Sequence, residues 1–216
     1  MKVLVLTGPE SSGKSWLAAS IQQTFGGVIV GEYVRHFIEQ HQRDTCYADI
    51  APIAQGQLAW EDAARAAAPQ LLILDTHLLS NMLWSQALFG ACPPWLEQQL
   101  LARHYDLHLL LDPNSVPWVD DGQRCQPQLP QREQFHQACR DWLQHHQQAY
   151  VDIQGDWSQR QQQALTDFVV HFQDVVAAYQ FFEAGVAGNL RAAAETRPGS
   201  ARGRSGPDLR GPARQR

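Results

Sequence analysis

The sequence predicts a three-layer α/β fold in which a five-stranded parallel sheet carries helices on both faces. Five short apolar segments alternate with helix-like stretches along the 216-residue chain, an order that is typical of βαβ units. Most of these segments are apolar throughout, as strands covered on both faces should be. The predicted strands are 3–6, 28–30, 71–74, 107–111 and 150–153.

The longer stretches between these strands have the apolar spacing and the end signals of helices. Gly26 and Gly27 end the first of them, and Pro69 ends the one before the third strand. Right-handed crossovers between parallel strands distribute such helices over both faces of a sheet. The predicted helices are 16–24, 51–68, 78–89, 95–103, 132–146 and 157–172, with a weaker continuation over 173–185.

A glycine-bounded loop, Gly-Pro-Glu-Ser-Ser-Gly-Lys-Ser, joins the first strand to the first helix and fits the pattern G-x-x-x-x-G-K-[ST]. Its glycines let several N–H groups converge on one phosphate, next to the positive end of the helix. Lys14, one of only two lysines, supplies a cation for the β- and γ-phosphates, and Ser15 a hydroxyl for Mg²⁺. The loop therefore predicts ATP and Mg²⁺ as cofactors. We expect ATP to contact Gly8, Glu10, Ser11, Ser12, Gly13, Lys14, Ser15 and Trp16.

Acidic residues follow two of the other strands. The third strand ends in Asp75-Thr76, the arrangement of a Walker B carboxylate, so we expect Asp75 and Ser15 to hold the metal. The second strand leads into Gly31-Glu32-Tyr33-Val34-Arg35. Because the carboxyl ends of parallel strands form the ligand crevice, this segment should meet the acceptor. Glu32 is the candidate base for the acceptor hydroxyl, and Asp75 is the competing choice.

A polar, irregular stretch covers residues 114–131 and contains Pro-Trp-Val-Asp-Asp-Gly-Gln-Arg, which ends at Arg124. Such a long loop is usually functional or disordered, and in a phosphotransferase it suits a lid that excludes water. Arg124 and Arg132 would then reach the transferring phosphate. Arg160, at the start of the last helix, would lie where adenine often binds in such folds. A plain surface loop with solvated arginines is the alternative.

Two absent features narrow the chemistry. A guanine-reading Asn/Thr-Lys-x-Asp motif is missing, because Lys2 and Lys14 are the only lysines. Thr76, rather than a water-activating Glu, follows Asp75. The sequence therefore favours phosphoryl transfer to an organic acceptor over GTP signalling or a hydrolytic motor, and the catalytic residues that we predict are Lys14, Glu32, Asp75 and Arg124.

In their order, the phosphate-binding loop, Glu-Tyr-Val-Arg, Asp-Thr and the Trp-x-x-Asp-Gly-x-Arg lid resemble NadR-type nicotinamide riboside kinase domains, over about residues 1–172. The resemblance implies ATP- and Mg²⁺-dependent phosphorylation of the riboside 5′-hydroxyl to give nicotinamide mononucleotide, a step of NAD salvage. The matching substrate-binding residues are Glu32, Tyr33, Arg35, Asp75, Trp118 and Asp121.

One departure from that family concerns the acceptor. Family members often place aromatic residues at positions that correspond here to Gly31 and Leu58, where they stack on the pyridine ring; Trp60 or Tyr33 would have to replace them. Two alternatives therefore stay open: a kinase for another nucleoside or nucleotide, and a non-catalytic regulatory module that binds ATP.

Composition sets the remaining expectations. The net charge is −5, yet residues 191–216 carry seven arginines against Glu195 and Asp208, so the body is strongly acidic and broad nucleic-acid binding is not expected. We predict a kinase domain over 1–185 and a basic disordered tail over 186–216. No apolar run reaches the length of a membrane span. Scattered cysteines indicate free thiols and a cytoplasmic protein. The oligomeric state stays open.

Overall fold

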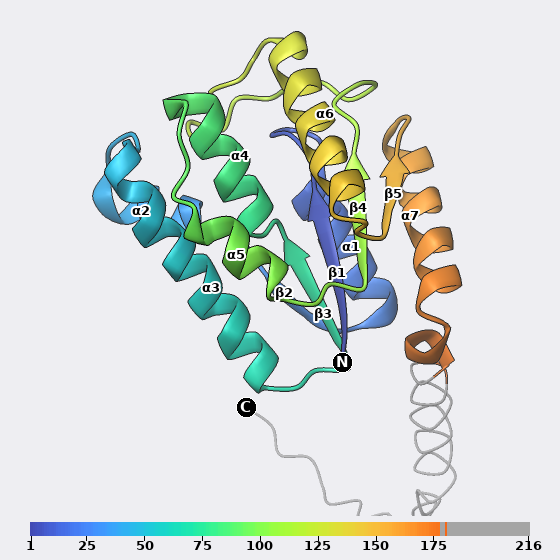
Figure 1. The fold of residues 1–216 in the computed structure, drawn as a ribbon. Helices are drawn as coiled ribbons and strands as arrows, with labels where there is room; N and C mark the ends of the chain where they lie inside the picture. The colour runs from blue at the N-terminus through green and yellow to red at the C-terminus, as the bar shows by residue number, and fades with distance from the viewer. Residues whose placement is uncertain (178–179, 181–216) are drawn as a thin grey trace, which may run out of the picture. The chain divides into compact units, whose positions relative to one another are not determined.

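The computed structural model describes residues 1–177 and 180, and its centre is a five-stranded, wholly parallel sheet of order β2-β3-β1-β4-β5 (Figure 1). The predicted fold class is confirmed. Each predicted strand is present and shifts by at most one residue at either end. The strands are β1 (Lys2–Thr7), β2 (Val28–Val30), β3 (Leu71–Asp75), β4 (Leu107–Leu111) and β5 (Tyr150–Ile153).

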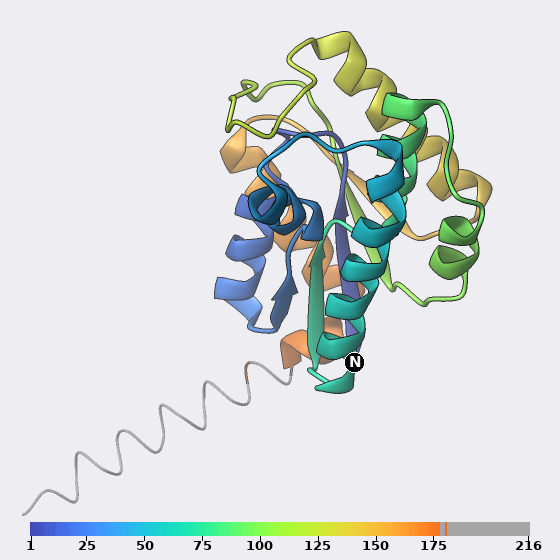
Figure 2. The same cartoon turned by 90° about the vertical axis from the view of Figure 1, so that its left-hand side faces the viewer.

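Helices cover both faces of the sheet (Figures 1 and 2). They are α1 (Lys14–Phe25), α2 (Tyr33–His41), α3 (Ile50–Ala66), α4 (Leu78–Phe89), α5 (Trp95–Leu101), α6 (Leu129–His145) and α7 (Trp157–His171), with a short 3₁₀ turn at Tyr47–Asp49. Successive strand residues point to opposite faces. In β1, Val3 and Val5 therefore join the core under α3–α6, whereas Leu4 and Leu6 join the core under α1 and α7.

The strand register gathers the candidate residues at one edge of the sheet. Leu6 of β1 lies opposite Asp75 of β3, and Thr7 lies opposite Leu110 of β4. The loop after β1 therefore emerges between the carboxyl ends of β3 and β4, at the crevice expected for an open α/β sheet.

Several finer expectations change. Helices α1 and α6 begin at Lys14 and Leu129, two and three residues before their predicted starts. After α7, residues 173–177 are again helical, but the rest of the predicted continuation to residue 185, the domain boundary and the tail lie outside the described residues. Within the part of the chain that is described, no helix is long and apolar enough to span a membrane.

Two histidines face each other in the core beneath the candidate site. Nε2 of His77 lies 3.3 Å from Nε2 of His108, and Nδ1 of His108 lies 3.1 Å from the carbonyl oxygen of Ala149. Because that carbonyl requires a proton on Nδ1 of neutral His108, Nε2 of His108 is the acceptor and His77 the donor. Burial lowers the pKa of His108 to about 4, and burial together with repulsion from His108 lowers the pKa of His77 well below 6.5.

This pair predicts loss of stability in mild acid. Between pH 6.5 and 4 the unfolded chain protonates these histidines while the folded chain does not, so the free energy of unfolding falls as the pH falls. His108 alone contributes a loss of about 2 kcal/mol between pH 7 and pH 5. Urea unfolding at both pH values measures it. His108→Gln should reduce the pH-dependent loss by about that amount, and an unchanged loss would contradict the assignment.

Candidate functional site

At two positions in the loop after β1, only glycine fits the backbone conformation and the space available. Gly8 and Gly13 have positive φ angles of 134° and 93°. A Cβ at Gly8 would lie 2.6 Å from the carbonyl oxygen of Leu111, and a Cβ at Gly13 would lie 2.6 Å from the ring of Trp157. Close packing against β4 and α7 therefore fixes the curled shape that the motif predicts.

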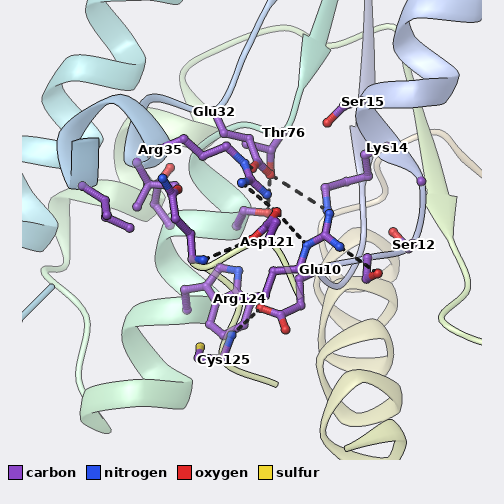
Figure 3. Close-up of a pocket in the computed structure, with 18 of the residues that line it drawn as sticks. Glu10, Ser12, Lys14, Ser15, Glu32, Arg35, Thr76, Asp121, Arg124 and Cys125 are labelled. Carbon is purple, nitrogen blue, oxygen red and sulfur yellow. Dashed lines mark hydrogen bonds and ion pairs between the residues drawn. The ribbon is translucent and has the colours of Figure 1, made fainter. Parts of the chain in front are cut away.

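The ammonium group of Lys14 lies over this loop. The residue as a whole is buried, with only 8% of its surface exposed. Its Nζ donates to the carbonyl oxygens of Gly8, at 3.1 Å, and Pro9, at 2.9 Å. It also lies 4.0 Å from Oε1 of Glu32 (Figure 3). The cation is thus held at the loop by weak neutral acceptors and by one carboxylate. A phosphate in the loop would offer it stronger, charged acceptors.

Asp75 lies beneath the same loop, at the end of β3. Burial raises the pKa of its carboxyl, and the negative charge of Glu32 raises it further, against the opposing effects of Lys14 and a hydrogen bond from Ser15. Its Oδ1 is buried and has no hydrogen-bond partner among the described residues. An unpaired oxygen next to a serine hydroxyl and a second carboxylate is a donor set that fits Mg²⁺.

Among residues 1–177 and 180, no group of three or more His, Cys, Asp or Glu side chains could form a metal cage. A magnesium ion here would therefore rely on Ser15, Asp75, water and phosphate oxygens, as is usual for Mg²⁺ at phosphate-binding sites. The residues present fit that kind of site.

Alternating charges extend from Lys14 to the lid, residues 114–128. Nε of Arg35 donates to Oε2 of Glu32 at 2.7 Å, and Nη1 of Arg35 donates to Oδ2 of Asp121 at 2.9 Å. Nε of Arg124 lies 3.0 Å from the same Asp121 oxygen. These five side chains point toward one another across the site (Figure 3). The structure thus brings together residues from α1, α2 and the lid.

Glu10 and Ser11 of the phosphate-binding loop hold the lid. The carboxylate of Glu10 accepts hydrogen bonds from the indole of Trp118, at 2.8 Å, and from the backbone N–H groups of Gln126 and Cys125, at 2.8 and 3.1 Å. The Ser11 hydroxyl oxygen accepts from the Val119 N–H and from Arg124, both at 3.0 Å, and donates to Pro117. The two most distinctive motifs of the sequence therefore bind each other.

Gln57 of α3 is a site residue that the sequence analysis missed. Its amide donates to the carbonyl oxygen of Gly31, at 3.1 Å, and accepts from the N–H of Tyr33, at 2.8 Å. It is buried and so fixes both peptides that flank Glu32. The only signal in the sequence is a polar side chain on a mainly apolar helix face, which does not reveal its partners.

The site opens into a cavity of about 530 Å³. Eleven of the predicted residues line it: Glu10, Ser11, Ser12, Gly13, Lys14, Ser15, Trp16, Glu32, Arg35, Asp121 and Arg124. Others that line it were not predicted as site residues, among them Gln57, Asn81, Trp84 and Trp157.

Arg132 and Arg160, which the sequence predicts to contact ATP, do not line the cavity. Both side chains are buried, and their guanidinium groups donate hydrogen bonds to backbone carbonyl oxygens. Arg132 donates to the carbonyls of Gln126 and Pro127 at the base of the lid. Arg160 donates to the carbonyls of Ser12, Asp112, Asn114 and Gly155. They brace the loops around the site instead of reaching into it.

Two expected substrate contacts also lie elsewhere. The ring of Tyr33 packs beside Trp60, with centroids 4.9 Å apart, and the indole of Trp118 bonds to Glu10. Neither these two rings nor Trp60 lines the cavity. Leu58 packs against the hydrophobic core, so it is not a ring-stacking position either.

Comparison with known proteins agrees with this geometry. Residues 3–160 match the family described as AAA domain, which is well over half of the chain. The chain belongs to this family. It is also 25% identical over 158 residues to the trifunctional NAD biosynthesis/regulator protein NadR of Escherichia coli (strain K12), and to NadR of Salmonella typhimurium to the same extent. The match covers 71% of this chain but only 38% of each relative. The predicted likeness to NadR is confirmed.

Solved structures show the same fold. A crystal structure of NadR protein in complex with NR has a TM-score of 0.67 at 18% identity and covers 79% of this chain and 50% of that chain. Thymidylate kinase from Ehrlichia chaffeensis has a TM-score of 0.58 at 12% identity, and the match covers 77% of this chain and 98% of that chain. Deoxyadenosine kinase from M. mycoides with bound dATP has a TM-score of 0.53 at 13% identity, and the match covers 78% of this chain and 99% of that chain. The fold is that of nucleoside and nucleotide kinases.

The hydrogen bonds between Glu10 and the lid should keep the lid closed, and the frequency of lid opening can be measured. Glu10→Gln keeps the shape but replaces charged acceptor oxygens with one neutral oxygen and one donor group, so the lid should open about tenfold more often. Limited trypsin cleavage after Arg124 measures this opening. Glu133→Gln, the same change at an exposed residue of α6, is the control. Equal cleavage rates in the two variants would contradict the anchor.

Proposed function

We propose that this chain is an ATP- and Mg²⁺-dependent kinase that phosphorylates the 5′-hydroxyl of a nucleoside-like acceptor, with nicotinamide riboside as the first candidate. The observation that carries the proposal is the meeting of Lys14 and Glu32, 4.0 Å apart, in one cavity. It places a cation suited to the transferring phosphate beside a carboxylate suited to a hydroxyl group.

The donor half of this mechanism belongs to α1 and its loop. The N–H groups of the loop and Lys14 would hold the β- and γ-phosphates, while Ser15 and Asp75 would hold Mg²⁺. Bound there, the ion would neutralise charge on the phosphate oxygens. Arg124 and Arg35 lie on the lid side of the cavity and would stabilise charge that develops on the transferring group.

The acceptor half depends on Glu32. It lines the cavity, whereas Asp75 lies beneath it beside Ser15, and this difference favours Glu32 as the base and Asp75 as a metal ligand. The hydroxyl proton would pass to Glu32 as the acceptor oxygen bonds to the γ-phosphorus. The bond from that phosphorus to the β,γ-bridging oxygen breaks, and ADP leaves.

The relatives support a kinase with either of two classes of acceptor. The likeness to NadR, and a neighbouring NadR structure in complex with NR, support nicotinamide riboside as acceptor. The thymidylate and deoxyadenosine kinases, of which the chain covers nearly the whole length, support a different nucleoside or nucleotide as the second candidate. Gly31, which offers no ring, and Leu58, which is in the core, favour that second candidate. The four free cysteines support the proposed cytoplasmic location.

An acceptor panel coupled to ADP release tests the proposal. Turnover should be highest with nicotinamide riboside among a set that includes thymidine, deoxyadenosine and thymidine monophosphate. Lys14→Ala and Glu32→Gln should each lower kcat at least about a hundredfold, because each removes a group that acts in the transition state.

Lys2→Ala is the matched control, since Lys2 is the other lysine and pairs with Asp106 at 3.6 Å, far along β1 from the loop. Turnover with a deoxynucleoside but not with nicotinamide riboside would replace the first candidate by the second. ATP binding without turnover on any acceptor would contradict a kinase and indicate a regulatory module.

A further inference from the structure

The cavity changes character with distance from the phosphate-binding loop. On α2, Val34 and Arg35 line it first, and Ile38 lies one turn further along the helix. On α3, Gln57 adjoins Glu32, and the next cavity residues toward the start of that helix are Ile53 and Ile50. Beyond Arg35 on α2 and Gln57 on α3, the cavity-lining residues of both helices are therefore aliphatic.

Helix α4 repeats this gradient and adds a flat surface. It begins just after Asp75 and Thr76, and its cavity-facing residues are Ser80, Asn81, Trp84 and Leu88. The spacing from Asn81 to Leu88 corresponds to about 10 Å along the helix. The polar members come first and the indole and leucine follow. The outer part of the cavity is thus an apolar chamber with one broad aromatic wall.

Resting on the proposed function, we propose that Trp84 and Asn81 bind the heteroaromatic ring of the acceptor, with Trp84 stacking on the ring and Asn81 reading an N–H group at its edge. A nucleoside has a polar, hydroxyl-bearing sugar and a flat, less polar ring. With the 5′-hydroxyl of the sugar at Glu32, its ring extends into the apolar chamber formed by α2, α3 and α4.

The state of the two side chains supports this assignment. Trp84 is half-buried and packs against Phe135 of α6, with ring centroids 4.9 Å apart, so its free face is fixed in position. The Oδ1 atom of Asn81 is buried and has no hydrogen-bond partner among the described residues. A buried acceptor in a cavity wall favours a ligand that donates an N–H group, such as a carboxamide or a ring amino group.

Charge also distinguishes this chamber from the rest of the cavity. The cavity-lining carboxylates are Glu10, Glu32 and Asp121, and each is already hydrogen-bonded within the phosphate-binding loop, α2 or the lid. The chamber residues Ile38, Ile50, Ile53, Trp84 and Leu88 carry no charge. Selection of a cationic pyridinium ring here would therefore depend on the face of Trp84.

Kinetics of the full-length chain test the aromatic wall. Trp84→Leu should raise KM for the acceptor about tenfold and leave KM for ATP unchanged, whereas Trp84→Phe, which keeps a flat ring, should retain most of the affinity. Trp60→Leu is the comparison, because Trp60 also lies among these helices but outside the cavity. A rise in acceptor KM in Trp60→Leu but not in Trp84→Leu would overturn the assignment.

Calorimetric binding in the presence of AMP-PNP tests Asn81 without requiring turnover. The ligand pairs are nicotinamide riboside with nicotinic acid riboside, and deoxyadenosine with purine 2′-deoxyriboside; only the first member of each pair carries an N–H donor on its ring or ring substituent. The wild type should prefer the donor-bearing member about tenfold, and Asn81→Leu should lose that preference. An equal preference in wild type and variant, or no binding of any of the four, would overturn the ring site.

Failure of the proposed function gives a different result. A wild-type chain that binds these ligands but transfers no phosphate contradicts the kinase while the ring site stands. A chain that transfers phosphate with unchanged acceptor KM in Trp84→Leu contradicts only the ring site.

Discussion

A single buried guanidinium holds the site together. Arg160 of α7 is fully buried and donates to the carbonyl oxygens of Ser12, Asp112, Asn114 and Gly155. These four carbonyls belong to the phosphate-binding loop, the segment after β4 and the turn after β5. Burial lowers the pKa of Arg160, which reflects the cost of keeping a cation from water; the four charge-assisted bonds offset that cost.

The loops held in this way position charged side chains in the cavity. When no ligand is present, these side chains form ion pairs with one another. Lys14, Glu32, Arg35, Asp121 and Arg124 alternate in sign across the cavity. A triphosphate would offer the three cations stronger acceptors, and the lid that carries Arg124 and Asp121 is already joined to the loop through Glu10 and Ser11. Preorganised charge of this kind is the main contribution that a protein makes to phosphoryl transfer.

The sequence predicted the parallel sheet, its strands and the cavity-lining residues of the phosphate-binding loop, because each depends on local patterns: apolar runs, glycine spacing and the residue after a strand. It did not predict partners that are distant in the chain. The sequence predicts Arg132 at the transferring phosphate and Arg160 near adenine, whereas both guanidinium groups donate to backbone carbonyl oxygens. Gln57, Asn81 and Trp84 carry no motif, and only the packing of α3 and α4 beside the loop brings them to the cavity.

The central claim, that Arg160 presets the shape of the phosphate-binding loop, is tested most directly by the affinity of Arg160→Lys for AMP-PNP. Lysine keeps the charge but cannot span four carbonyls, so calorimetry at a temperature where the variant is folded should show at least about tenfold weaker binding. Arg140→Lys, which alters a guanidinium paired with Asp152 at 2.7 Å, should bind like the wild type. Unchanged AMP-PNP affinity in folded Arg160→Lys would contradict the claim.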